Sequence, residues 1–147
     1  MDDIDSLPLA GQLRAALCDF VNAAGHRRRL PTLFHVGTPG GVQVTVPHDL
    51  YFDHGLRADL VERAIDGLDG AAAERPVPWL TRSGDLAPTD ADFAWFSAAR
   101  EGFARHDRAL PGFFVITRQG WLNLANDDVI RWRRIRPAPT RRDQSPA

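Results

Sequence analysis

The sequence predicts one mixed α/β domain, because its apolar residues recur with both helical and strand periodicity. Three segments carry apolar residues at helical spacing, residues 42–46 alternate apolar and polar side chains, and residues 113–117 are apolar without alternation. The 147 residues suffice for one domain with its own hydrophobic core. We expect this domain to span residues 1–136 and residues 137–147 to form a disordered tail rich in proline and arginine.

The first helix is expected to start after Ser6 and Pro8, both of which favour helix starts, and to end at Gly25 as a C-cap. Its apolar stripe consists of Leu9, Leu13, Leu17, Phe20 and Ala24. A hairpin should follow. Residues 33–36 form its first strand, and residues 42–46 form its second, half-buried strand after a turn rich in proline and glycine.

The second helix is expected to bury one amphipathic face. That face consists of Leu56, Leu60, Ala64, Ile65 and Leu68. Residues 77–81 then predict a short strand. Because proline lacks the N–H that a sheet ladder needs, Pro78 favours an edge strand or the first residues of the strand.

A third helix should open at residues 88–92. Its expected buried face consists of Phe93, Phe96, Ala99 and Phe103. The continuous apolar run at 113–117 is typical of a central strand covered on both faces. Residues 118–120 then turn the chain into a strand at 121–124, and residues 129–135 fit an edge strand or a short helix.

Composition excludes several classes of protein. Cys18 is the single cysteine, so the chain can form neither an internal disulfide nor a cysteine zinc site. No apolar run approaches the roughly 18 residues of a spanning helix, and the acidic start lacks the positive charge of a secretory signal. We therefore expect a cytoplasmic protein that does not bind membranes.

Charge is distributed unevenly along the chain. All 18 basic residues are arginine, which a GC-rich coding sequence explains without any nucleic-acid partner. Residues 1–130 hold 12 arginines against 18 acidic residues, whereas residues 131–147 hold six arginines against Asp143. The body is therefore acidic and the C-terminus basic.

The most specific stretch runs Trp79-Leu80-Thr81-Arg82-Ser83-Gly84-Asp85, followed by Pro88-Thr89-x-x-Asp92. It resembles the signature of the JAB/MPN metalloprotease fold, and within that fold the RadC-like branch. In that signature a His-x-His pair precedes a serine and an aspartate. Ser83-Gly84-Asp85 and Thr89-x-x-Asp92 fall at the family spacing, with Thr89 in place of the serine. The resemblance covers roughly residues 33–125 and implies a curved sheet flanked by helices.

The departure from the family pattern concerns its metal. In the family, two histidines and the aspartate hold a zinc ion whose bound water attacks an amide or isopeptide carbonyl. Trp79 and Thr81 stand at the histidine positions, and neither is a normal zinc ligand, so only Asp92 remains. The resemblance therefore implies a domain that has lost this chemistry, with no catalytic residues and no cofactor.

The same residues also have a purely structural interpretation. Thr89-x-x-Asp92 is a capping box before an apolar run, which is a common way to start a helix. Ser83-Gly84-Asp85 is ordinary loop chemistry. Both interpretations stay open at the level of sequence.

Two further groups of residues suggest chemistry. His48 and His54 sit in a segment that fits a solvated loop, and with Asp92 they could rebuild a metal site. Guanidinium groups beside an aromatic ring can bind phosphates and stack on a base. Near the C-terminus such groups flank Trp132, namely Arg131, Arg133 and Arg134, and a second cluster is Arg27-Arg28-Arg29. The same arginines could instead pair with acidic residues of the chain.

Three functional hypotheses follow. The first is a non-catalytic protein- or peptide-binding module, since relatives take an extended peptide beside the segment equivalent to 79–92. Its candidate contacts are Trp79, Arg82 and Trp121, while Trp95 fits either a contact or the core. The second is a nucleic-acid-associated protein that acts through its arginine-rich C-terminus. The third is a metal-dependent hydrolase with the rebuilt site.

Overall fold

The computed structural model describes residues 3–132, which form a six-stranded mixed sheet with the order β2-β1-β3-β4-β5-β6. The strands are β1 (Leu33–Gly37), β2 (Gln43–Pro47), β3 (Val77–Thr81), β4 (Phe114–Thr117), β5 (Gly120–Asn123) and β6 (Asp128–Arg131). All neighbouring pairs are antiparallel except β3 and β4, which are parallel. The predicted mixed α/β class is confirmed.

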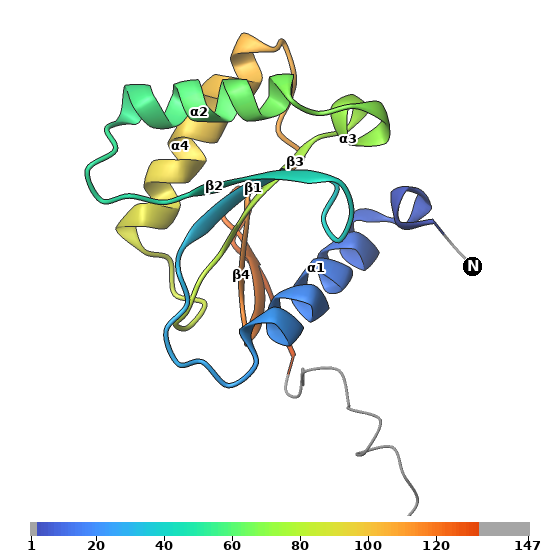
Figure 1. Ribbon diagram of the computed structural model, residues 1–147, viewed down its shortest axis with the longest axis vertical. Helices are drawn as coiled ribbons and strands as arrows, with labels where there is room; N and C mark the ends of the chain where they lie inside the picture. Colours follow the sequence, from blue (N-terminus) through green and yellow to red (C-terminus); the bar gives the residue numbers. More distant parts are fainter. Residues whose placement is uncertain (1–2, 133–147) are drawn as a thin grey trace, which may run out of the picture.

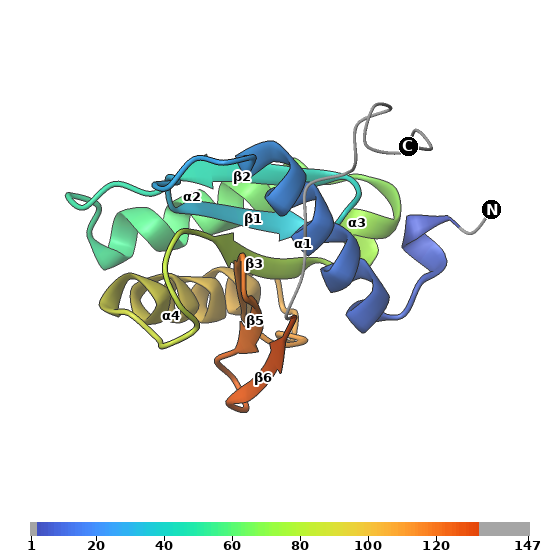
Figure 2. The same ribbon diagram turned by 90° about the horizontal axis from the view of Figure 1, so that it is seen from below.

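Helices cover both faces of this sheet (Figures 1 and 2). The helical segments are η1 (Ile4–Ser6), α1 (Leu9–Ala24), α2 (His54–Asp66), α3 (Gly70–Glu74) and α4 (Asp90–Arg105). In Figure 1, α2 and α4 lie above the sheet and α1 lies below it. Among residues 3–132, no helix combines the length and the apolar character needed to cross a bilayer.

The core consists of one apolar cluster on each face of the sheet. Along β3, Leu80 points to the cluster under α2 and α4, whereas Trp79 points to the cluster under α1. Along β4, Val115 joins the first cluster and Ile116 the second. Successive side chains of a strand point to opposite faces. The run at 113–117 is apolar because both of its faces are covered, as predicted.

Of the two alternatives that Pro78 favoured, an edge position for β3 is wrong. The strand lies between β1 and β4, and Pro78 pairs with Val36 of β1. The ladder to β4 begins only at Trp79, so the missing N–H of Pro78 is not needed on that side. The alternative that confined the proline to the first residues of the strand is the one that holds.

The expected buried faces of the second and third helices are partly wrong. Leu56 is 43% and Phe93 51% exposed, whereas Trp95 is fully buried, so Trp95 belongs to the core. The contact between α2 and α4 uses small residues instead. A Cβ on Gly102 would lie 2.5 Å from Val61 Cγ1, which shows how closely the two helices approach. Close packing therefore favours small residues where α2 and α4 touch, while Trp95 and Phe103 of α4 pack in the core.

The helix cap and the hairpin that the sequence predicts near the N-terminus are both present. Gly25 caps α1 with a φ of 57°, as predicted, and the hairpin of β1 and β2 is confirmed. Residues 129–135 were expected to form an edge strand or a short helix. In the described part of this segment the edge strand is confirmed, because β6 is exposed and lies at the edge of the sheet. The short α3 was not expected. The tail predicted at 137–147 lies outside the described residues.

Gly120 starts β5 in a conformation that only glycine adopts easily. Its φ is +137°, and a Cβ there would lie 1.9 Å from the carbonyl oxygen of Ile130. We expect Gly120→Ala to lower the free energy of unfolding by more than about 2 kcal/mol, measured by urea titration. The control is Gly70→Ala, where φ is also positive but no atom lies within 4 Å. A cost of only about 1 kcal/mol is expected there. Equal costs would contradict the prediction.

Candidate functional site at the carboxyl ends of β3 and β4

A buried ion pair follows β3 directly. Arg82 is 6% exposed and Asp92 fully buried. Arg82 Nε lies 2.9 Å from Asp92 Oδ1, and Arg82 Nη2 lies 2.8 Å from Asp92 Oδ2. The remaining guanidinium hydrogens go to three backbone carbonyls of the loop, namely those of Ser83, Asp85 and Ala87. The arginine therefore fixes the whole turn between β3 and α4.

The capping box predicted at the start of α4 is confirmed. Thr89 Oγ1 accepts a hydrogen bond from the Asp92 amide at 3.2 Å, and the Thr89 amide donates to Asp92 Oδ2 at 3.0 Å. Together with Arg82, these contacts occupy both oxygens of the Asp92 carboxylate. Asp92, the residue that the resemblance aligned with a metal ligand, thus fixes the start of α4 and the loop before it.

Trp79 and Thr81, the two residues that the sequence resemblance aligned with histidines, both contact His35. His35 of β1 lies opposite Trp79 in the sheet and stacks on its indole with a centroid distance of 5.1 Å. Its Nε2 is 2.8 Å from Thr81 Oγ1, and its Nδ1 is 2.8 Å from Thr45 Oγ1 of β2. Burial lowers the pKa of His35 to about 4, so the ring is neutral at physiological pH.

This arrangement corrects two of the predicted binding contacts. Trp79 is 1% exposed and packs in the cluster under α1, so its indole is not available to a partner. Arg82 is buried as well, and its guanidinium donates hydrogen bonds to Asp92 and to backbone carbonyls of the loop. Ser83 is partly accessible, and its hydroxyl accepts a hydrogen bond from the Leu30 amide at 2.6 Å.

A pocket of about 360 Å³ lies beside this loop, at the carboxyl ends of the parallel strands β3 and β4. It is lined by Arg28, Leu30, Ser83, Gly84, Asp85, Arg118 and Gln119. In open α/β sheets, ligands bind at this end of the strands. A larger cavity of about 570 Å³ includes Arg75 and Val77, at the opposite end of β3, and no residue of 79–92 lines it.

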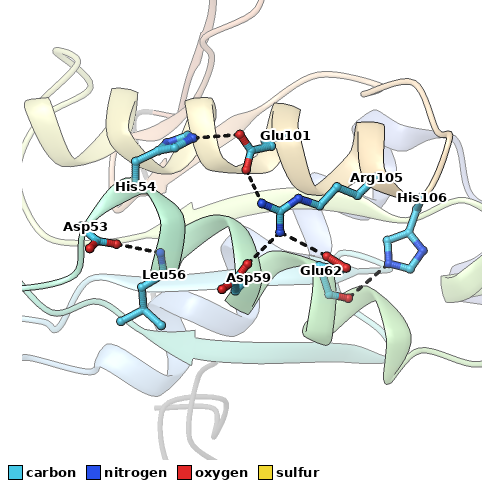
Figure 3. Close-up of polar contacts among 8 residues, drawn as sticks. All are labelled: Asp53, His54, Leu56, Asp59, Glu62, Glu101, Arg105 and His106. Carbon is cyan, nitrogen blue, oxygen red and sulfur yellow. Dashed lines mark hydrogen bonds and ion pairs between the residues drawn. The ribbon is translucent and has the colours of Figure 1, made fainter.

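The histidines considered for a rebuilt metal site have separate partners. His48 Nδ1 accepts a hydrogen bond from the Trp95 indole at 3.0 Å, whereas His54 faces Glu101 at 3.2 Å (Figure 3). Burial, and then the charge of Arg57, lowers the pKa of His48, against the opposing effect of Asp49. Within residues 3–132, no group of three or more histidine, cysteine or acidic side chains could hold a metal ion. The structure therefore does not bring His48, His54 and Asp92 together.

Figure 3 also shows that α2 and α4 are joined by exposed charges. Arg105 of α4 pairs with Glu101 of its own helix and with Asp59 and Glu62 of α2. The hydrogen bonds that Arg105 donates to Asp59 and Glu62 raise the pKa of Arg105. Because these side chains are solvated, the network aligns the helices but contributes little stability.

The aromatic residues near the C-terminus are packed. Trp132 lies 6.1 Å from Trp121 between ring centroids, and the Arg14 guanidinium covers its ring at 4.7 Å. Both tryptophans line an apolar groove of about 570 Å³ between α1 and β6. Arg131 donates to Gln119 Oε1. Arg133 and Arg134 lie outside the described residues.

Comparisons with known proteins add no relative. No protein-family model matches the chain, and neither a curated protein nor a solved structure matches it.

Proposed function

We propose that the chain is a non-catalytic, JAB/MPN-like binding module that takes an extended segment of a partner protein at the carboxyl ends of β3 and β4. The observation that carries this proposal is the pairing of Arg82 with Asp92. Both oxygens of that carboxylate are occupied by neighbouring groups, so the residue at the surviving family ligand position is not free for zinc.

The other former ligand positions support the same conclusion. Trp79 and Thr81 are buried and serve as contacts of the neutral His35. A water molecule made nucleophilic by zinc needs a metal with an open coordination position. With three positions committed to packing and hydrogen bonding, the site is suited to binding rather than hydrolysis.

The partner would contact the pocket beside the loop. Ser83, Gly84 and Gln119 offer it polar groups, and Leu30 offers an apolar surface. A small number of polar groups around an apolar contact is typical of ligand sites. The resemblance implies an extended peptide at this place, and a polar pocket between two loops fits such a ligand.

The test is selection of linear peptides from a random display library on the full chain, followed by affinity measurement and mass spectrometry of the bound peptide. We expect peptides that remain intact and whose binding is lost in Gln119→Trp, because the larger side chain fills the pocket. Gln43→Trp is the matched control, since Gln43 is also exposed but lies on β2, paired with Gly37 at the other end of β1. Failure to select any peptide that depends on Gln119, or cleavage of the selected peptides, would overturn the proposal.

A further inference from the structure

Arginines that are distant in sequence meet at the end of the sheet that holds this pocket. Residues 25–32 connect α1 to the start of β1, and β1 pairs there with the last residue of β3. Figure 1 shows the loop after α1 and the loop after β3 at the same lower end of the molecule. Ser83 ties them together through Leu30. Arg118 follows β4, and Arg131 pairs with Gly120 beside it.

Five arginines therefore lie at this end of the sheet, namely Arg27, Arg28 and Arg29 after α1, Arg118 after β4 and Arg131 at the end of β6. We call them the basic end. None of the five forms an ion pair with a carboxylate of residues 3–132, whereas Arg82 and Arg105 do. Other arginines of these residues, such as Arg75, are also without an ion pair, so it is the grouping of the five that sets this end apart. Arg27 and Arg118 donate only to backbone carbonyls at the end of α1. Arg28 lines the pocket and is exposed.

This concentration of charge stands out against an acidic body, in which residues 1–130 carry more acidic residues than arginines. Unpaired arginines on one face attract anionic groups and bind carboxylates through two parallel hydrogen bonds. Asp85 is the acidic residue that lines the pocket, and its carboxylate accepts a hydrogen bond from the Ala87 amide.

We infer that the basic end recognises an acidic peptide segment, in which a glutamate or aspartate side chain enters the pocket between Arg28 and Arg118. This inference rests on the proposed function and names its partner class. No aromatic side chain lines the pocket, and Trp132 is packed under Arg14. The pocket therefore provides no aromatic ring on which a nucleic-acid base could stack, and the acidic body repels a long polyanion. A short acidic segment needs only the local charge, and Leu30 supplies an apolar contact.

The experiment is fluorescence anisotropy of a labelled glutamate-rich peptide against the full chain. We expect Arg28→Glu to weaken binding about tenfold, because the reversed charge repels the peptide. Arg75→Glu has the same charge change on another exposed arginine, but at the opposite end of β3, and should change the affinity by less than about twofold. Added salt should weaken binding of the peptide. Arg28 makes no hydrogen bond within residues 3–132, so an unchanged unfolding midpoint should confirm that the variant folds.

Three results would overturn the inference. One is equal weakening by Arg28→Glu and Arg75→Glu, and another is equal binding of a lysine-rich peptide. The third is a single-stranded oligonucleotide that binds more tightly than the peptide and depends on Arg28, which would assign the basic end to nucleic acid. If library peptides bind through Gln119 but are not acidic, the proposed function stands and only the inference about charge fails.

Discussion

Asp92→Asn will lower the free energy of unfolding by about 3 kcal/mol, because it leaves the Arg82 guanidinium buried without its counter-charge. Arg82 is 6% exposed and donates two hydrogen bonds to this carboxylate. Urea unfolding followed by circular dichroism measures the effect. The same variant weakens the capping box, since Asp92 also accepts from the Thr89 amide.

Asp90→Asn is the matched control for this prediction. Asp90 lies in the first turn of the same helix but is exposed, so its replacement should cost no more than about 0.5 kcal/mol. The double variant Arg82→Met/Asp92→Leu should lose less free energy of unfolding than the sum of the losses of Arg82→Met and Asp92→Leu measured singly. The reason is that the double variant leaves no unpaired buried charge. A similar small loss for Asp92→Asn and Asp90→Asn would show that the pair is not structurally important.

Lowering the pH will destabilise the domain through His35. Its pKa is about 4 in the folded chain against 6.5 for the unfolded chain. Between these values the unfolded chain binds a proton that the folded chain does not, so stability falls as pH falls from 6.5 towards 4. The shift corresponds to about 3 kcal/mol over this window. The lowered pKa of His48 acts in the same direction.

Urea unfolding at a series of pH values measures this dependence, with His35→Gln as the comparison. Glutamine can hydrogen-bond to Thr45 and Thr81 but does not titrate, so the variant should show a much shallower slope of stability against pH in this window. The groups that contact His35 are Thr45 from β2 and Thr81 and Trp79 from β3, and none is charged. Identical slopes for the two proteins would contradict the assignment to His35.

Local signals predicted most of the secondary structure. The order of helices and strands, the glycine cap of α1 and the capping box at Thr89 depend on residues close together in sequence. The sheet order depends on tertiary packing. Pro78 favoured either an edge strand or the first residues of a strand, and the second alternative holds: β3 is central, and its ladder to β4 starts one residue after the proline. The predicted buried faces are wrong at Leu56 and Phe93, because packing between α2 and α4, not residue size alone, decided which side chains are buried.

The candidate site could be predicted only in part. The sequence singles out Asp92, but it predicts Arg82 as a candidate binding contact and not as the partner of Asp92. One sequence signal could have predicted this ion pair: Arg82 comes immediately after a buried strand and ten residues before Asp92, the acidic residue that caps α4. His35 could not be connected to Thr81 and Thr45 from the sequence, since those residues reach it only when β1 lies between β2 and β3. The meeting of Arg28 with Arg118 likewise depends on the sheet order.

The central claim is that Trp79, Thr81 and Asp92, which the proposed resemblance aligns with metal ligands, serve the fold instead. Zinc content of the purified full chain, measured after incubation with excess zinc and desalting, tests it most directly. Because Arg82 occupies the Asp92 carboxylate and Thr81 contacts His35, we predict that no zinc is retained. Retention of a full equivalent per chain would contradict the account and would redirect attention to peptide and isopeptide hydrolysis.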